Sequence, residues 1–192
     1  MNLWTYHDPG FSLTSGRVDH ALSPYADDPA IMEAYRELGR RLDIPDLQIV
    51  WCYTRHGDYS VTGIERFEWH LSVPSDDIIV CIDGVVWNRI IGKPPGATTE
   101  MYDKWREEAR QLYPHDSASR HWHEKERLQQ FQNEPAPPGG WWSRLFVPLQ
   151  AGEMVSAIIP HPVKKSWAVA TTLVSSSLNN ARRLERAQKR RR

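Results

Sequence analysis

Two ionisable side chains, Glu68 and His70, stand two residues apart in a segment that alternates apolar and polar residues. Because side chains of a strand alternate between its two faces, Glu68 and His70 share one face, while Glu65 points to the other in the absence of a bulge. A carboxylate beside an imidazole can do general acid–base work. The same pattern is also typical of the solvated side of a sheet, which is the more common case.

A second group of ionisable residues surrounds His115, His121 and His123. With Asp116 and Glu124 nearby, these are residue types that bind metal ions. His121 and His123 are two positions apart, however, so on a helix their side chains point about 200° apart. A zinc site needs three or four converging ligands. We therefore expect solvent-facing or hydrogen-bonded histidines and predict no metal site.

The C-terminus carries the most explicit functional signal. From Ala181 onward there are seven basic residues and one acid, Glu185, a charge of +6, so the rest of this neutral chain carries −6. Basic side chains pair with phosphates and release counterions, which predicts salt-sensitive, sequence-independent binding to nucleic acid, or binding to an acidic protein. A solubilising tail, or one that docks on an acidic body, is the alternative. The residues predicted to contact phosphates are Arg182, Arg183, Arg186, Lys189 and Arg190.

The composition is ordinary for a soluble globular protein, with 192 residues, 40% apolar and 25% charged. The apolar runs are too short to span a membrane and the N-terminus lacks a signal pattern, which predicts a cytoplasmic protein without membrane contact. The nine tryptophans are scattered along the chain, as core residues are. Cys52 and Cys81 lie in predicted strands, where we expect buried, unreactive thiols rather than a disulfide.

Common catalytic motifs are absent. The stretch GKPPG at 92–96 lacks the spacing and the following helix of a phosphate-binding loop. No serine lies in the sequence pattern of a nucleophile elbow. No complete motif therefore names a reaction.

The stretch 64–83 is the part around which we expect the rest to pack. Its first half alternates apolar and polar residues, which predicts a half-buried strand. Turn residues follow at 74–77, and the apolar run 78–82 predicts a strand covered on both faces. Further strands are expected at 2–7, 48–54, 154–159 and 166–174.

Helices are expected between these strands. Asp28 and Pro29 are a typical N-cap and first helical residue, and Pro45 disfavours continuation beyond Asp43. Further helices are expected near 87–91, from Thr98 or Thr99, from Ser117 or Ser119, and at 141–146. Because there is no regular βαβ alternation, we predict an α+β fold with a mixed or antiparallel sheet. One domain should cover 1–174, followed by a basic, flexible tail at 175–192.

Four stretches occur together in an order that resembles a bacterial family of domains of unknown function: LWTYH (3–7), IVWCYT (49–54), EWHLSVPSDDIIVCID (68–83) and WWSRLF (141–146). Members of that family tend to open with Leu-Trp-Thr, and they carry a strand running into Val-Pro and an acidic turn. A Trp-x-Arg-Ile/Leu-Phe helix and a final pair of strands follow. The resemblance covers residues 2 to about 170 and implies a compact domain but, by itself, no activity.

The layout of that family is more remotely similar to the ADP-ribosyltransferase fold. In that fold the first strand carries a His or Arg that holds NAD, and a second strand places an aromatic residue or Ser against the nicotinamide. The resemblance therefore implies NAD as cofactor, His7 with its neighbour Thr5 on the first strand, and Tyr53 or Trp51 on the second.

A late strand of that fold opens with Glu or Gln, which implies Glu153 as the catalytic carboxylate. A carboxylate can hold the ribose 2′-hydroxyl and orient or deprotonate the acceptor at an oxocarbenium-like transition state. The same position can instead align with Ser156, which would make the chain a binding or degenerate member. The leading expectation is an ADP-ribosyltransferase-like domain that binds NAD or a related nucleotide and modifies a nucleic acid or protein. The alternative is a non-enzymatic protein that binds through its basic tail.

Overall fold

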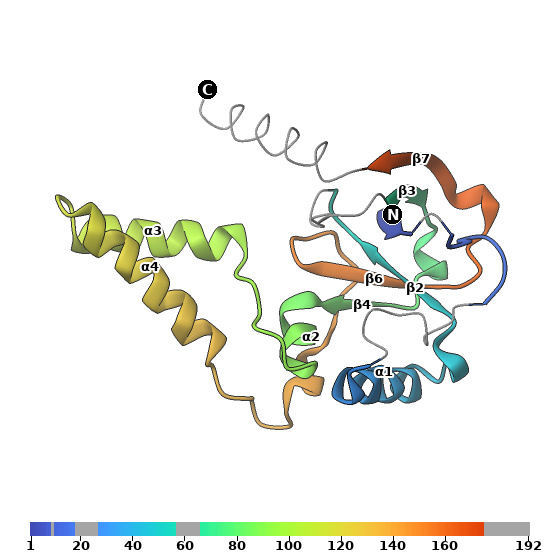
Figure 1. Cartoon of the computed structure of the whole chain (residues 1–192), viewed down its shortest axis with the longest axis horizontal. Helices are drawn as coiled ribbons and strands as arrows, with labels where there is room; N and C mark the ends of the chain where they lie inside the picture. Colours follow the sequence, from blue (N-terminus) through green and yellow to red (C-terminus); the bar gives the residue numbers. More distant parts are fainter. Residues whose placement is uncertain (9, 18–26, 57–65, 175–192) are drawn as a thin grey trace. The chain divides into compact units, whose positions relative to one another are not determined.

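The computed structural model describes residues 1–8, 10–17, 27–56 and 66–174 (Figure 1). Contacts divide the chain into two compact units. Unit 1 consists of Met1–Cys81 and Pro148–Arg192, and unit 2 consists of Ile82–Val147. The prediction of one domain over 1–174 did not anticipate this division.

Unit 1 is built on a sheet with the strand order β4-β6-β2-β1-β3-β7. The pairs β1–β2, β1–β3, β2–β6 and β3–β7 are all antiparallel. The predicted α+β class with an antiparallel sheet is thus confirmed. β3 and β4, which follow one another in the sequence, are separated in the sheet by β1, β2 and β6. The strands are β1 (Asn2–His7), β2 (Ile49–Tyr53), β3 (Arg66–Ser72), β4 (Val80–Asp83), β6 (Val155–Pro160) and β7 (Ala168–Val174).

One face of this sheet forms the hydrophobic core. Leu3, Val50, Leu71 and Ile159 come from four different strands, and the pairing of the strands puts all four on the same face. All four are buried. Each such side chain stabilises the fold by about 1.5–3 kcal/mol. On the second face Ile49 and Ile158 are also buried, so the alternation separates an apolar face from a more polar one only along β1 and β3.

Helix α1 (Pro29–Leu42) begins and ends as its sequence predicts. The carboxylate of Asp28 accepts hydrogen bonds from the backbone N–H groups of Ala30 and Ile31, which are free at a helix start. The helix ends at Asp43, whose φ of 54° is left-handed. A 3-10 turn, Pro45–Leu47, then leads into β2. On the second face of the sheet, the rings of Tyr35 and Trp51 meet edge to face, 5.9 Å apart.

Unit 2 is mainly helical, and Arg89 joins its segments. The side chain of Arg89 is 5% exposed, donates to the carbonyl of Phe131 and pairs with Glu134. Its guanidinium also lies over the ring of Trp141, 4.4 Å from the centroid. α3 and α4 lie side by side as a hairpin (Figure 1). The elements are α2 (Gly84–Ile90), α3 (Thr99–Leu112), α4 (Ser117–Gln132), a 3-10 helix (Trp141–Arg144) and β5 (Phe146–Val147).

One local prediction in unit 2 needs correction. The segment 141–146 is a 3-10 helix followed by the short strand β5, rather than one helix, because the backbone turns at Leu145, whose carbonyl accepts a hydrogen bond from the N–H of Asp83 within the same unit. α4 begins at Ser117, as predicted, and the carboxylate of its N-cap residue, Asp116, accepts hydrogen bonds from the backbone N–H groups of Ala118 and Ser119. Among the helices of the described ranges, none is long and apolar enough to cross a membrane.

Candidate functional site

The pairing of Trp4 with Tyr53 across β1 and β2 decides which predicted site residues can meet. Paired residues of antiparallel strands point to the same face, and their immediate neighbours point to the other. Tyr53 and Trp51 therefore share the face of Trp4, whereas Thr5 and His7 lie on the opposite face. The four residues expected to bind NAD are divided between two faces, so they do not line one site.

Thr5 and His7 form a buried polar contact of their own. The hydroxyl of Thr5 donates to the carbonyl of Trp51 at 2.8 Å and lies 2.9 Å from Nε2 of His7. Because a hydroxyl has one hydrogen, its oxygen accepts the proton of His7 Nε2. Burial, together with the nearby His161 and Arg66, lowers the pKa of His7 from 6.5 to about 4, so the ring is neutral at pH 7. His7, which was expected to hold a nucleotide, thus contacts Thr5 within the fold.

Glu153 lies in the turn that precedes β6, where it pairs with Arg55 at 3.4 Å. Ser156 is the β6 residue that pairs with Tyr53 in the sheet. Ser156, which could take the position of the catalytic carboxylate, therefore lies next to Tyr53 on the same face of the sheet. Glu153 lies outside the strands. Because His7 lies on the face opposite to Tyr53, the predicted combination of His7, Tyr53 and Glu153 in one cleft is not formed.

The predicted phosphate-binding residues lie outside the described residues. They all belong to the segment 175–192, and they are Arg182, Arg183, Arg186, Lys189 and Arg190.

Among the described residues, polar side chains from three segments meet instead at Glu68, on the second face of the sheet. Its Oε2 accepts a hydrogen bond from the phenol of Tyr6 at 2.7 Å and lies 3.2 Å from Nε2 of His56. Tyr6 comes from β1, Glu68 from β3, and His56 from the segment after β2. The Glu68 side chain is 12% exposed. A carboxylate held in this way has a fixed orientation while remaining accessible to solvent.

Aromatic rings surround this carboxylate. Trp4 stacks on His70 at 5.1 Å with an interplanar angle of 5°, and it lies 5.5 Å from His56. Tyr53 meets Tyr6 edge to face at 5.9 Å. All of these rings are half-buried. We call Tyr6, Glu68 and His56, with Trp4, Tyr53 and His70, the aromatic face.

A cation completes the row along β3. Arg66, Glu68 and His70 stand two residues apart, so they share one face of the strand. Arg66 forms an ion pair with Asp8 at 3.2 Å, and its side chain is 27% exposed. The row thus combines a cation, a carboxylate and an imidazole beside the rings of β1.

Of the three histidines in the α4 region, His115 and His121 are exposed and His123 is buried. His123 lies 3.7 Å from Glu108, which also pairs with Arg127, so it helps to join α3 and α4. Within the described ranges, no three His, Cys, Asp or Glu side chains are grouped as metal ligands. Cys52 and Cys81 are buried and free, as predicted, and burial raises the pKa of both thiols.

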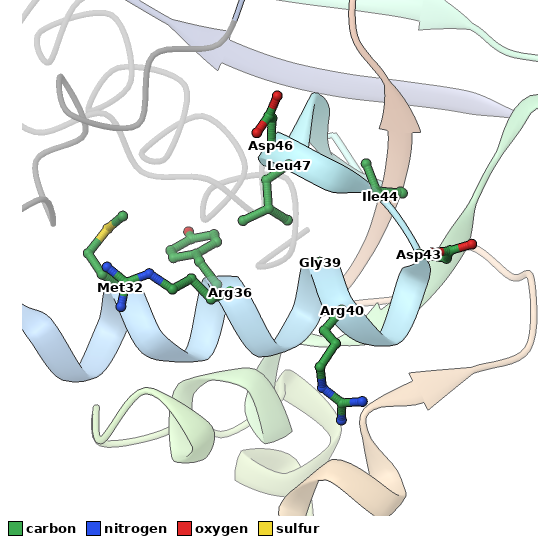
Figure 2. A pocket seen from close by; sticks show the side chains of 9 residues that line it. Met32, Arg36, Gly39, Arg40, Asp43, Ile44, Asp46 and Leu47 are labelled. Carbon is green, nitrogen blue, oxygen red and sulfur yellow. The ribbon is translucent and has the colours of Figure 1, made fainter.

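A pocket of about 530 Å³ lies between α1 and the turn Pro45–Leu47 (Figure 2). Figure 2 shows the side chains of Met32 and Arg36 on α1 and that of Leu47 on the turn. The volume suits a small molecule. Three of its charged groups are already paired, however: Arg36 with Glu33, Arg40 with Glu37 and Asp46 with Arg17. The pocket can accept a ligand, but it offers no imidazole or thiol among its described lining residues for chemistry.

The sequence indicated only part of the aromatic face. Glu68 and His70 are recognisable from their spacing on one strand. His56 and Tyr6 were not proposed as their partners, because nothing local in the sequence tells which strands pair. The hydroxyl of Tyr6 and its place two residues from Trp4 on the same strand face were the available signal.

The chain has no significant match among known families, curated proteins or solved structures: no family model fits the sequence, and neither a curated protein nor a solved structure is similar to it.

Proposed function

We propose that this chain binds a nucleotide-containing ligand on the aromatic face and performs acid–base chemistry there with Glu68. The observation that carries the proposal is the shared oxygen of Glu68. Tyr6 and His56 both contact Oε2. Oε1 accepts no hydrogen bond from any residue that the structure describes, so it can take a proton from a ligand hydroxyl.

The ligand class follows from the rings beside the carboxylate. Trp4 and Tyr53 are paired across β1 and β2 and are both half-buried. Stacking of a base on such a ring contributes about 1–3 kcal/mol and tolerates different bases. A ribose next to a stacked base would bring its hydroxyls toward Glu68. A nucleotide uses both the rings and the carboxylate, which neither a purely apolar nor a purely anionic ligand would do.

NAD is the first nucleotide to test, because the remote resemblance to ADP-ribosyltransferases implies it. In this proposal Glu68 replaces Glu153 as the carboxylate that contacts a ribose hydroxyl. His7 has no part in binding, since it lies on the opposite face and its Nε2 contacts Thr5.

The test combines binding with turnover. Calorimetric titration of the full chain with NAD, AMP and GMP measures binding, and incubation with adenylate-labelled NAD measures turnover. We expect Trp4→Leu to weaken binding of the nucleotide. We expect Glu68→Gln to abolish turnover of any substrate that the unsubstituted chain converts. Glu153→Gln and Glu107→Gln are matched controls that should behave as the unsubstituted chain. Binding that is unchanged in Trp4→Leu, or turnover that depends on Glu153 and not on Glu68, would exclude the aromatic face.

The charge of the C-terminus supports a second proposal, binding of nucleic acid through residues 182–190. The segment from Ala181 carries seven basic residues against one acid. Deleting residues 178–192 should weaken binding to single-stranded nucleic acid and reduce its dependence on salt. Equal affinity of the two chains would remove this proposal.

A further inference from the structure

We infer that the ligand of the aromatic face is single-stranded RNA, and that the row Arg66–Glu68–His70 cleaves it through the ribose 2′-hydroxyl. This inference rests on the proposed function, because it names the nucleotide that the rings bind and the reaction that Glu68 serves. Two observations support it: the order of the three side chains along β3, and the side chains of β1 that lie beside them.

Cleavage of RNA at its own 2′-hydroxyl needs three groups and no external nucleophile. A base removes the 2′-hydroxyl proton, an acid protonates the departing 5′-oxygen, and a cation or donor stabilises the charge on the phosphate. Base and acid must lie on opposite sides of one phosphorus atom. Adjacent side chains on one face of a strand are about 7 Å apart, since each residue advances about 3.3 Å. That spacing leaves room for a phosphate between Glu68 and His70.

Glu68 is suited to act as the base. Its Oε2 is held by Tyr6 and His56, which fixes the carboxylate, and Oε1 is the oxygen without a partner among the described residues. The side chain is 12% exposed, so a ribose hydroxyl can reach it. Tyr6 and His56 are positioning residues in this scheme, because they act through Glu68.

His70 is suited to act as the acid. Its ring stacks on Trp4 with an interplanar angle of 5°, and its Nε2 lies 3.3 Å from Oδ1 of Asn2. When Nε2–H donates to Asn2, Nδ1 is the atom that carries the transferred proton. Two contacts thus hold the ring in one orientation without using both of its nitrogens.

Arg66 provides the cation at the other end of the row. Its partner, Asp8, has a side chain that is 65% exposed. An arginine next to an exposed carboxylate can turn its guanidinium toward a phosphate, which it binds with two parallel hydrogen bonds. Arg66 is the one arginine or lysine of β3.

The step balances without a further reactant. The 2′-oxygen forms a bond to phosphorus, and the bond from phosphorus to the 5′-oxygen breaks. The 2′-hydroxyl proton passes to Glu68, and a proton passes from His70 to the 5′-oxygen. The products are a 2′,3′-cyclic phosphate and a free 5′-hydroxyl, and exchange with water restores both side chains. DNA lacks the nucleophile and should bind without being cleaved.

RNA is favoured over a free mononucleotide by the charge of the chain. The segment from Ala181 carries +6, which suits a polyanion rather than a single phosphate. Stacking on Trp4 and Tyr53 tolerates any base, so we expect cleavage with little sequence preference.

The experiment uses the full chain and an RNA oligonucleotide of mixed sequence with a fluorophore and a quencher at its ends. The same sequence as DNA and as 2′-O-methyl RNA provides substrates that lack the nucleophile. Glu68→Gln and His70→Asn are the test variants, and Glu107→Gln and His121→Asn are exposed, matched controls. Mass spectrometry identifies the product ends, and circular dichroism checks that each variant is folded.

We expect cleavage of RNA alone, 2′,3′-cyclic phosphate ends, and a loss of about 100-fold or more in each folded test variant. The control variants should cleave RNA as the unsubstituted chain does. RNA that binds but stays intact would overturn the inference and leave the proposed function standing. Failure to bind either RNA or mononucleotides would sink both. Cleavage of DNA, linear phosphate ends from the start, or full activity in Glu68→Gln would also overturn the inference.

Discussion

Tyr6 and Glu68 pair directly across β1 and β3, and the phenol of Tyr6 donates a 2.7 Å hydrogen bond to Oε2 of the carboxylate. His56, from a third segment, lies 3.2 Å from the same oxygen. A carboxylate that is bonded on one side only keeps one oxygen for a ligand. This asymmetry distinguishes Glu68 from Glu37 of α1 and Glu107 of α3, whose two oxygens both accept hydrogen bonds from side chains of the same helix.

Replacing Tyr6 by Phe tests this relationship. The change removes one hydrogen bond to a charged group and leaves the ring that packs against Tyr53. We expect the free energy of unfolding to fall by about 1–2 kcal/mol, measured by urea denaturation. Cleavage of RNA should fall more than RNA affinity does, because Tyr6 orients Glu68. Tyr113→Phe, at an exposed position of unit 2, is the control, and a Tyr6→Phe chain as stable and active as the unsubstituted one would contradict the assignment.

His7 should make the stability of the fold depend on pH. Its pKa is about 4 in the folded chain, against 6.5 ordinarily, mainly because it is buried. The unfolded chain therefore takes up the proton first as the pH falls. The stabilisation is complete above pH 6.5, is lost progressively as the pH falls to about 4, and amounts to at most about 3 kcal/mol.

The measurement compares the free energy of unfolding at pH 7 and pH 4.5 in the unsubstituted chain and in His7→Asn. Asn has no group that titrates in this range. We expect a shallower loss of stability between these pH values in His7→Asn, whereas His121→Asn should keep the original slope. Equal slopes in all three chains would show that His7 does not titrate in this range.

The sequence predicted single elements better than it predicted the site. Asp28 and Pro29 start α1, and the alternation in 64–73 matches β3, because capping and strand periodicity are local properties. The pairing of β1 with both β2 and β3 is not local, and it decides that Tyr53 faces Trp4 while His7 faces away. This pairing separates the residues that were predicted to bind NAD. A residue's face can be read from its own strand, but its neighbours across the sheet cannot.

The backbone conformation of the turn after α1 is a second feature that the sequence does not predict. Asp46 and Leu47 both have positive φ values, 60° and 46°, which their side chains disfavour. Nothing in the sequence PDL announces such a conformation. It is stabilised by tertiary contacts, including the burial of Leu47 beside Gly39. Backbone strain of this kind is set by the packing around it rather than by local preference.

Gly39 should not tolerate a larger residue. A Cβ atom there would lie 3.1 Å from the carbonyl oxygen of Ile44 and 3.2 Å from the side chain of Leu47. Although alanine is the better helix former, the contact with backbone cannot be relieved by turning a side chain. We expect Gly39→Ala to lower the free energy of unfolding by about 1–2 kcal/mol in thermal or urea denaturation. Gly10→Ala has open space and should change it by less than about 0.5 kcal/mol. A stabilised Gly39→Ala would mean that the turn after α1 yields readily.

Arg89 should be essential to the stability of unit 2. Its side chain is 5% exposed and contacts the end of α4, Glu134 and the ring of Trp141. Arg89→Met would leave the carbonyl of Phe131 without this donor, and we expect a loss of about 2–3 kcal/mol. Arg89→Lys keeps the charge without the planar fork and should lose less. Arg110→Met removes an exposed pair with Glu107 and should cost under about 0.5 kcal/mol, so equal effects of Arg89→Met and Arg110→Met would contradict the role of Arg89.

Deleting residues 178–192 separates binding of a polyanion from chemistry on the aromatic face. Each phosphate contact with single-stranded nucleic acid contributes about −0.7 to the slope of log K against log salt. Loss of five basic contacts should therefore reduce the magnitude of that slope by about 3 to 4. Titrations of labelled RNA at several salt concentrations measure the slope, and a chain with a scrambled tail is the control, which should match the unsubstituted chain because the contacts carry no sequence information.

Glu68 and His70 remain in the shortened chain, so we expect KM for RNA to rise while kcat is kept. A fall in kcat with unchanged KM would place the basic residues in the reaction itself, and an unchanged salt slope would show that they do not meet phosphates.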